Sequence, residues 1–502
     1  MAENLLCSHP AVREAAVVRD DSGRTVAFVV PQDSYLSHEM GGSVTNRLTV
    51  NKWRKIYDLS QLTKGAAVAQ PGFNTAGWDS SYTNRPLPAG EIHEWIDAAV
   101  GAVLELRPRR LYEIGCGTGL LLTRIAPHCE RYVAADFSSA VLARLRKELQ
   151  DKPSLLERVE LFERQADDFS GLDADSFDTV VLNSVVQYFP GLPYLTDVLK
   201  QAVRVVKQGG HVYIGDVRSL PLLPAFATSV ELFHAASDLS IEDLKVRVRH
   251  RLEREKELVL SPAYFLQQEN QLAKVSRVDI RPARGRSDNE MTRYRFSAVL
   301  HVGHDAAPMS DVEFADWGSQ RRSVKEIRAS LERGIVGAEG IRCVKNARVE
   351  QDLVAMELIK SASTTDTVAQ LRRRLGDTSV AGIVPEGLHE LAVAHHDVAV
   401  HLSWAQARRD GSYDALLVPR HPQNACSSPL VSWPQPAPHD LMRFATWPGQ
   451  ENARQELMKQ IEFYTNRNLP PEQRLKSIEL VDNLVRDRSG EVNTAALLSF
   501  QI

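Results

Sequence analysis

The sequence has few cysteines, no strong net charge and no long apolar run. Its five cysteines are scattered through 502 residues without a Cys-x-x-Cys pair, so we expect reduced thiols rather than a disulfide scaffold or a zinc site. A net charge of −4 provides no basic field for nucleic acid or an anionic membrane. No run reaches the roughly 18 apolar residues of a membrane span, and the N-terminus lacks the blocks of a signal peptide. These absences predict a cytoplasmic protein that binds neither nucleic acid nor membrane.

Histidine pairs are the only feature that suggests a metal. His395 and His396 are adjacent, and His301 and His304 are three residues apart. No carboxylate or cysteine joins them at the spacing of a metal site. We therefore predict no metal.

Strand and helix patterns alternate through the first half of the chain, which is typical of βαβ units and a parallel sheet. The predicted strands are 110–114, 131–136, 159–162, 177–182 and 211–215. The predicted helices are 91–106, 120–126, 138–149 and 194–207. Residues 275–280 and 292–302 follow as two strands, which we expect to pair antiparallel at the edge of the sheet.

The flanking segments are less regular. Residues 11–31 indicate two strands with a turn at 20–23, and the polar residues 32–50, with Gly41 and Gly42, indicate a linker. Beyond residue 303 the sequence predicts helices at 323–332 and 367–375 and a strand at 398–404. A proline-rich joint at 428–438 and a helix at 451–467 complete the pattern.

A glycine loop is the strongest chemical signal. Glu113, Gly115, Gly117 and Gly119 form the pattern Glu-x-Gly-x-Gly-x-Gly directly after a predicted strand and before a helix. Such glycines let the backbone turn sharply and approach a ligand. The pattern differs from Gly-x-Gly-x-x-Gly, and no Lys-Ser/Thr follows as in a phosphate-binding loop.

Polar residues end the neighbouring predicted strands. Asp136 lies 21 residues after Gly115, where an acidic residue can accept both hydroxyls of a ribose. Asp167 and Asn183 follow the next two strands and would face the same crevice, with Asp167 able to accept from an adenine amino group. Ordinary turn glycines with solvent-facing acids, or a dinucleotide oxidoreductase, are the alternatives that the pattern leaves open.

Five segments together resemble the methyltransferase domains embedded in the adenylation domains of nonribosomal peptide synthetases. They are Phe73–Tyr82, Glu113–Gly119, Asn183–Pro190, Gly215–Leu223 and Asn289–Tyr294. The resemblance runs from about residue 50 to 420. It implies a class I, Rossmann-like α/β fold with S-adenosylmethionine (SAM) as cofactor. The residues predicted to bind SAM are Tyr82, Glu113, Gly115, Cys116, Gly117, Gly119, Asp136, Phe137, Ala166, Asp167, Asn183 and Ser184.

The two ends of the chain resemble pieces of the small C-terminal subdomain of an adenylation domain. We predict four parts: an N-terminal piece at 1–40, the methyltransferase core with its lid at 41–302, an α+β accessory region at 303–432, and a degenerate C-terminal piece at 433–502. The large part of an adenylation domain is absent, and Glu491 replaces the family's lysine. A carboxylate there would not stabilise developing negative charge, so we expect no adenylation.

Members of this family usually methylate the α-amino group of an aminoacyl unit on a carrier protein. The resemblance therefore implies a carrier-bound aminoacyl or peptidyl substrate, neighbouring synthetase domains as partners, and Glu290 as the residue that orients the amine or takes its proton. Asn289, Gln187, Asn183 and Arg218 complete the predicted acceptor site.

Several alternatives stay open at this stage. Glu290 could be a surface acid paired with Arg293, and Arg218 could be structural. Tyr82 could be a core aromatic residue. O- or C-methylation of a similar substrate, an epimerase role and a non-catalytic docking module are the alternative functions of this chain.

Overall fold

The computed structural model describes residues 2–19, 25–32, 43–64, 78–303, 312–318, 324–335, 337–363, 365–394, 398–419, 433, 444–446, 448, 450–481, 484–487 and 491–494. The chain divides into two compact units, one of Met1–Asn51 with Trp447–Ile502 and one of Lys52–Thr446. The finer division predicted at residues 40, 302 and 432 stays a prediction.

A seven-stranded sheet in the order β5-β4-β3-β6-β7-β9-β8 is the centre of the larger unit. The first five strands in this order, β5, β4, β3, β6 and β7, run parallel. Strand β9 pairs antiparallel with both β7 and β8. The predicted mostly parallel sheet with an antiparallel terminal hairpin is therefore confirmed. The strands are β3 (Arg110–Ile114), β4 (Arg131–Asp136), β5 (Val159–Glu163), β6 (Phe177–Asn183), β7 (Val206–Arg218), β8 (Val275–Pro282) and β9 (Arg295–Val302).

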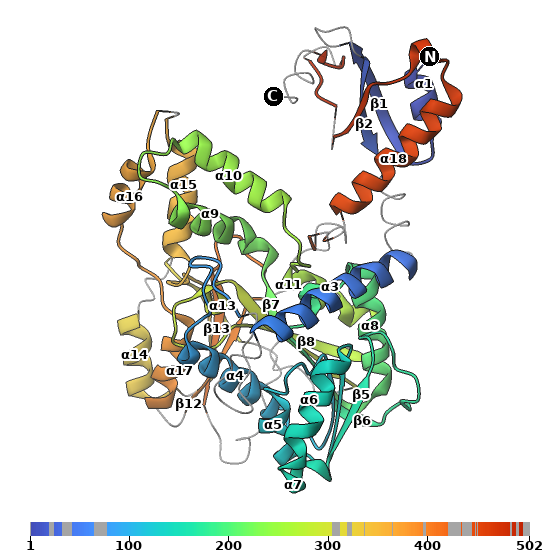
Figure 1. Cartoon of the computed structure of the whole chain (residues 1–502). Helices are drawn as coiled ribbons and strands as arrows, with labels where there is room; N and C mark the ends of the chain where they lie inside the picture. Colours follow the sequence, from blue (N-terminus) through green and yellow to red (C-terminus); the bar gives the residue numbers. More distant parts are fainter. Residues whose placement is uncertain are drawn as a thin grey trace. The chain divides into compact units, whose positions relative to one another are not determined.

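Amphipathic helices cover this sheet (Figure 1). Helix α4 buries Ile92 and Ile96 completely against the sheet, together with residues of α5 and α6. Ser138 caps α6, because its side chain accepts from the Val141 N–H. The covering helices are α4 (Ala89–Leu104), α5 (Leu122–Ile125), α6 (Ser139–Gln150), α7 (Pro153–Leu156) and α8 (Leu192–Val205).

The predicted strand 292–302 is wrong at its start. Thr292 belongs to a single helical turn, α13 (Glu290–Arg293), and β9 begins at Arg295. The Asn289 side chain accepts from the N–H groups of Met291 and Thr292, which satisfies the first backbone donors of this turn. A local cap therefore prevails over the strand pattern at the position that carries Glu290.

The predicted linker at 32–50 is also wrong in its second half. Helix α3 (Ser43–Lys64) begins inside it, while Gly41 and Gly42 lie outside the described residues. No glycine or proline interrupts the sequence from Ser43 to Lys64, so a helix that starts there has no internal breaker.

A second, four-stranded sheet in the order β10-β11-β13-β12 lies in the same unit. Its strands are β10 (Phe314–Asp316), β11 (Glu339–Val344), β12 (Val398–Ser403) and β13 (Tyr413–Pro419). Helices α9, α10, α15 and α16 form a separate layer (Figure 1) around buried Ile241, Leu244 and Val368. The further helices are α9 (Leu223–His234), α10 (Ile241–Glu253), α11 (Pro262–Leu266), α12 (Gln268–Gln271), α14 (Val324–Arg333), α15 (Glu350–Ser361), α16 (Val368–Gly376) and α17 (Pro385–Ala394).

The smaller unit joins the two ends of the chain in one sheet. Strand β2 pairs antiparallel with β1 and parallel with β14. Leu457 and Ile461 of α18 bury against this sheet. The elements are α1 (Ala2–Cys7), β1 (Val12–Arg19), β2 (Thr25–Pro31), α18 (Gln450–Asn468) and β14 (Ser477–Leu480).

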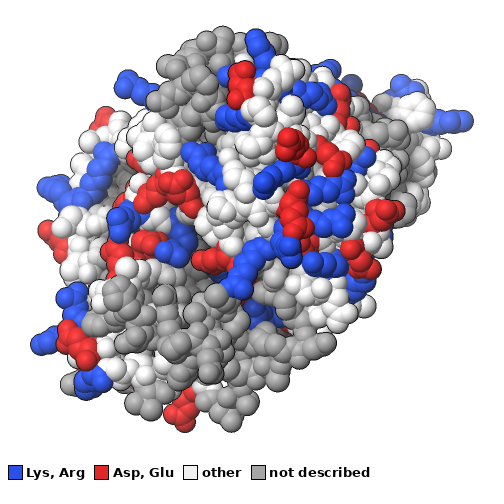
Figure 2. Space-filling view, turned by 90° about the horizontal axis from the view of Figure 1, so that it is seen from below, with Lys and Arg blue, Asp and Glu red and all other residues white. Residues whose placement is uncertain are grey.

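Two surface features bear on partners. Among the described residues, no helix combines the length and apolar character that crossing a membrane requires. Figure 2 shows a face on which basic and acidic side chains are interspersed, so this face has no extended field of one sign.

Candidate cofactor and methyl-acceptor site

The glycine loop leaves β3 in left-handed backbone conformations. Gly115, Gly117 and Gly119 have φ angles of 73°, 51° and 79°, a region that residues with a side chain rarely adopt. A Cβ at Gly115 would lie 2.5 Å from a methyl carbon of Val185, and one at Gly119 would lie 2.7 Å from a methyl carbon of Leu145. The loop therefore requires glycine for both conformation and space.

Replacing Gly115 tests this requirement. Gly115→Ala should lower the free energy of unfolding by about 1–2 kcal/mol, because alanine is strained in the left-handed conformation. The contact with Val185 should lower it further, and SAM binding should weaken. Gly171→Ala is a matched control, because Gly171 has a φ of 71° and open space around it. Thermal unfolding and calorimetry would measure both. Wild-type SAM affinity in Gly115→Ala would contradict the role given to the loop.

Asp136 joins the loop to the next strand. Its Oδ2 accepts from the Gly117 N–H at 2.9 Å and its Oδ1 accepts from the Ser138 N–H at 2.9 Å. The side chain is buried, and burial raises the pKa of Asp136 to about 6 against the effect of these backbone hydrogen bonds. The carboxylate thus lies beside the glycine loop, where the sequence predicts the ribose contact.

The raised pKa of Asp136 predicts a pH-dependent cofactor affinity. Below about pH 6 the carboxyl gains a proton and becomes a weaker acceptor for ribose hydroxyls. We expect SAM affinity to fall by about tenfold between pH 7.5 and pH 5, since about a tenth of the groups stay ionised one unit below the pKa. Calorimetry across this range would measure it. Asp136→Asn should show no such dependence, and a flat wild-type profile would contradict the prediction.

The side chains of Glu113 and Cys116 are buried in the protein interior. The Tyr132 hydroxyl donates to Glu113 at 2.7 Å, and burial raises the pKa of Glu113 to about 7. Burial and the nearby Asp136 also raise the pKa of the Cys116 thiol. These contacts give both residues a supporting position, and their predicted part in cofactor binding stays a prediction.

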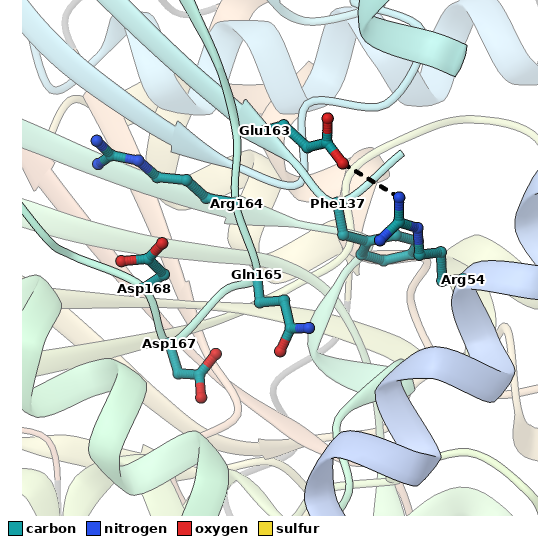
Figure 3. Close-up of a pocket in the computed structure, with 7 residues that line it drawn as sticks. All are labelled: Arg54, Phe137, Glu163, Arg164, Gln165, Asp167 and Asp168. Carbon is teal, nitrogen blue, oxygen red and sulfur yellow. Dashed lines mark hydrogen bonds and ion pairs between the residues drawn. The ribbon is translucent and has the colours of Figure 1, made fainter. Parts of the chain in front are cut away.

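A pocket of about 540 Å³ is lined mostly by residues at and after the ends of β4 and β5, among them Phe137, which follows Asp136 in the sequence (Figure 3). The predicted residues Phe137 and Asp167 line it, and Ala166 lies between two of its lining residues. Asp167 accepts a hydrogen bond from the Tyr194 hydroxyl at 2.9 Å. The lining residues are Arg54, Phe137, Glu163, Arg164, Gln165, Asp167 and Asp168.

Helix α3 covers this part of the sheet, and the sequence patterns did not predict this helix. Arg54 pairs with Glu163 at 3.1 Å across the pocket (Figure 3). The Tyr57 ring lies 6.0 Å from that of Phe137, and its hydroxyl lies 3.0 Å from where a Cβ at Gly117 would be. The Trp53 ring contacts that of Tyr188. Aromatic residues four apart, on one helix face, were the signal that could have found this cover.

Two buried side-chain carbonyl oxygens belong to residues at and just after the end of β6. Asn183 Oδ1 and Gln187 Oε1 are buried, and neither accepts a hydrogen bond from any described residue. The predicted cofactor residue Ser184 lies between them, where its hydroxyl donates to Asp216 at 2.6 Å. Because a buried polar atom without a partner is costly, each of these oxygens indicates a place for an N–H or O–H donor.

Glu290 is buried, with 7% of its surface exposed. Its carboxylate accepts from the Ser81 N–H at 3.1 Å, which ties α13 to the segment before α4. Arg293 instead pairs with Asp288 and Asp352. The structure therefore does not place Glu290 in the surface pair with Arg293 that the sequence left open.

The other predicted acceptor residues have structural partners. Asn289 caps α13 and donates from Nδ2 to Glu91 at 2.6 Å. Arg218 forms ion pairs with Glu255 and Glu257. Their predicted roles at the acceptor stay predictions.

The described contacts of Tyr82 are with Ser229 and two phenylalanines, and not with the glycine loop. The residue before it, Ser81, bonds Glu290. The Tyr82 hydroxyl bonds that of Ser229 at 2.7 Å, and its ring packs edge-on against Phe226 and Phe233. Its predicted SAM contact stays a prediction.

Among the described residues no group of three or more His, Cys, Asp or Glu could hold a metal ion. His304, His395 and His396 lie outside them.

Two families match parts of the chain. Residues 112–212 match the family described as a methyltransferase domain, and residues 2–55 match the C-terminal domain of AMP-binding enzymes. The first match covers the glycine loop, Asp136 and the ends of β5 and β6, which are the elements that build the site.

Relatives match most of this chain but little of their own length. Chondramide synthase of Chondromyces crocatus is 34% identical over 484 residues, which are 93% of this chain and 12% of that protein. The beauvericin nonribosomal cyclodepsipeptide synthetase of Beauveria bassiana is 27% identical over 99% of this chain and 16% of its own. The N-methyltransferase NodS from Bradyrhizobium japonicum is 17% identical over 42% of this chain and 97% of that one, with a TM-score of 0.27.

Together the sheet topology and the methyltransferase-domain match define a class I SAM-dependent methyltransferase domain, with SAM as its cofactor. The same chain carries a fragment of an AMP-binding C-terminal domain, and homologous segments of nonribosomal peptide synthetases cover most of it. The expected resemblance is thereby confirmed.

Proposed function

We propose that this chain transfers a methyl group from SAM to the α-amino nitrogen of an aminoacyl or peptidyl unit tethered to a carrier protein, in nonribosomal peptide biosynthesis. The unpartnered oxygens of Asn183 and Gln187 carry the proposal. An amine brings N–H donors to two acceptors, whereas a hydroxyl brings one donor and a carbon acceptor brings none.

The residues around the loop suit the cofactor. Asp136 offers a carboxylate for the ribose, and the pocket beside Phe137 and Asp167 offers space with polar groups for the adenine. SAM supplies a methyl group already activated on a sulfonium. The chain then has to hold the acceptor in line with that group, and such positioning contributes several kcal/mol.

Glu290 handles the proton of the acceptor in this scheme. An α-ammonium group has no lone pair, so it must lose a proton before it attacks a methyl group. Glu290 takes that proton at a carboxylate oxygen, while the Ser81 N–H holds the carboxylate in place. Asn183 Oδ1 and Gln187 Oε1 accept from the remaining N–H groups and orient the nitrogen.

We also propose that the chain does not adenylate amino acids. Glu491 is exposed and stands where the family usually has a lysine that serves the acyl phosphate. Its negative charge would repel, rather than stabilise, the charge that develops during adenylation.

Intact-protein mass spectrometry of aminoacyl-loaded carrier proteins with this chain and SAM tests the function. We expect a gain of one methyl group, which fragmentation assigns to the α-nitrogen. Carriers loaded with the N-acetylated unit and with the corresponding α-hydroxyacyl unit are matched controls. A gain on the hydroxyacyl carrier alone would mean O-methylation, and no gain on any carrier despite measured SAM binding would reject the proposal.

A further inference from the structure

Two residues with side chains adopt left-handed conformations at adjacent strand ends. Ser184 follows β6 with a φ of 58°, and Asp216 lies in β7 with a φ of 61°. The Ser184 N–H donates to the Gly215 carbonyl at 3.2 Å. Asp216 lies where the pairing of β7 with β9 shifts register, between Ile214 and Val217. Such strained positions persist only where surrounding contacts hold them, and they concentrate at functional sites.

Three donors converge on the Asp216 carboxylate. Oδ2 accepts from the Ser184 hydroxyl at 2.6 Å and from Arg295 Nη1 at 2.5 Å, while Oδ1 accepts from Trp95 Nε1 at 3.1 Å. The Asp216 side chain is 1% exposed. A charge this deeply buried is tolerated because it is paired and hydrogen-bonded. The donors come from α4, β9 and the end of β6, so the carboxylate joins three elements.

The Ser184 hydroxyl transmits this arrangement to Gln187. A hydroxyl has one proton, and Ser184 donates it to Asp216, so its oxygen can only accept from other groups. Gln187 Nε2 donates to that oxygen at 3.2 Å. The nitrogen end of the amide is therefore directed at Ser184, and Oε1 becomes the end that is buried without a donor.

We propose that Asp216 is a positioning residue, which acts through the Ser184 hydroxyl to determine the direction in which Gln187 presents its carbonyl oxygen to the methyl acceptor. The inference rests on the proposed function, because the acceptor amine is the donor that this oxygen receives. Arg295 neutralises the carboxylate, and the charge of Glu290 also acts on the same guanidinium. Arg295 thus interacts electrostatically with both carboxylates, the one that directs Gln187 and the one that takes the proton.

A double-mutant cycle tests the pathway. Ser184→Gly removes the hydroxyl at a φ that glycine tolerates, and Gln187→Ala removes the carbonyl. Each should lower kcat on a loaded carrier by about tenfold, the effect of one lost hydrogen bond. The double variant should be no slower than Gln187→Ala, because Ser184 acts only through Gln187. A fall in SAM affinity in Ser184→Gly, measured by calorimetry, would instead assign the Ser184 hydroxyl to the cofactor, as the sequence predicts, and would overturn the proposal. Multiplying effects would overturn the proposal.

A crystal structure of Asp216→Ala provides a readout that does not depend on turnover. The substitution removes both carboxylate oxygens, so the Ser184 hydroxyl loses its acceptor, and we expect this hydroxyl and the Gln187 amide to turn from their present directions. An unmoved Gln187 would overturn the inference. If the wild-type chain methylates no amine, the proposed function fails, while this crystal structure still decides whether Asp216 directs Gln187.

Discussion

Asp136→Ala is expected to bind SAM at least about a hundredfold more weakly than the wild-type chain. Two charge-assisted hydrogen bonds to ribose hydroxyls, each contributing about 1.5–3 kcal/mol, would be lost. The substitution also removes the acceptor for the Gly117 and Ser138 N–H groups. Isothermal calorimetry would measure the affinity.

The control for this variant separates charge from loop structure. Asp136→Asn keeps the shape and one acceptor oxygen, so it should maintain the loop while it loses the charge. We expect its SAM affinity to lie between those of wild type and Asp136→Ala. Wild-type affinity in Asp136→Ala would remove Asp136 from the cofactor site.

Glu290→Gln is expected to bind SAM normally and to transfer the methyl group at least about tenfold more slowly, the lower range of losses when a general base is removed. The amide keeps an oxygen for the Ser81 N–H, so the local structure should persist. The deficit should shrink as the pH rises, because the amine then loses its proton to solvent. Single-turnover transfer to a loaded carrier would measure the rate.

Asp288→Asn is a matched control for Glu290→Gln. Asp288 lies two residues away, its side chain is 61% exposed, and it pairs with Arg293. An exposed pair of this kind contributes little, so this variant should transfer methyl groups as fast as wild type. Unchanged turnover in Glu290→Gln would show that the role given to Glu290 is wrong.

The periodic patterns were sufficient to predict the parallel half of the sheet. Strands β3 and β4 have the predicted bounds, and α6 begins within one residue of its predicted start. These elements follow from short buried runs separated by amphipathic helices, which are properties of neighbouring residues. The prediction failed where a local cap competed with a strand pattern, at Thr292, and where a polar sequence concealed a helix, at Ser43.

The contacts around Asp216 could not be predicted in the same way. Asp216 and Arg295 are 79 residues apart, and they meet only because β9 inserts beside β7 and not beside β5. Gln187 carried no sequence signal for its direction, which depends on a serine hydroxyl held from another strand. The cover of Trp53 and Tyr57 over the cofactor side likewise depends on how α3 packs.

By itself, the sequence determined the glycine loop, its acidic partner Asp136 and the class of fold, because close backbone approach and ribose recognition require particular residue types at short spacings. The tertiary structure alone decided which carbonyl oxygens are buried without a donor, those of Asn183 and Gln187. It also decided which buried charges form an ion pair, those of Asp216 and Arg295. Burial and pairing are properties of the packed sheet, because water would satisfy the same groups in an extended chain.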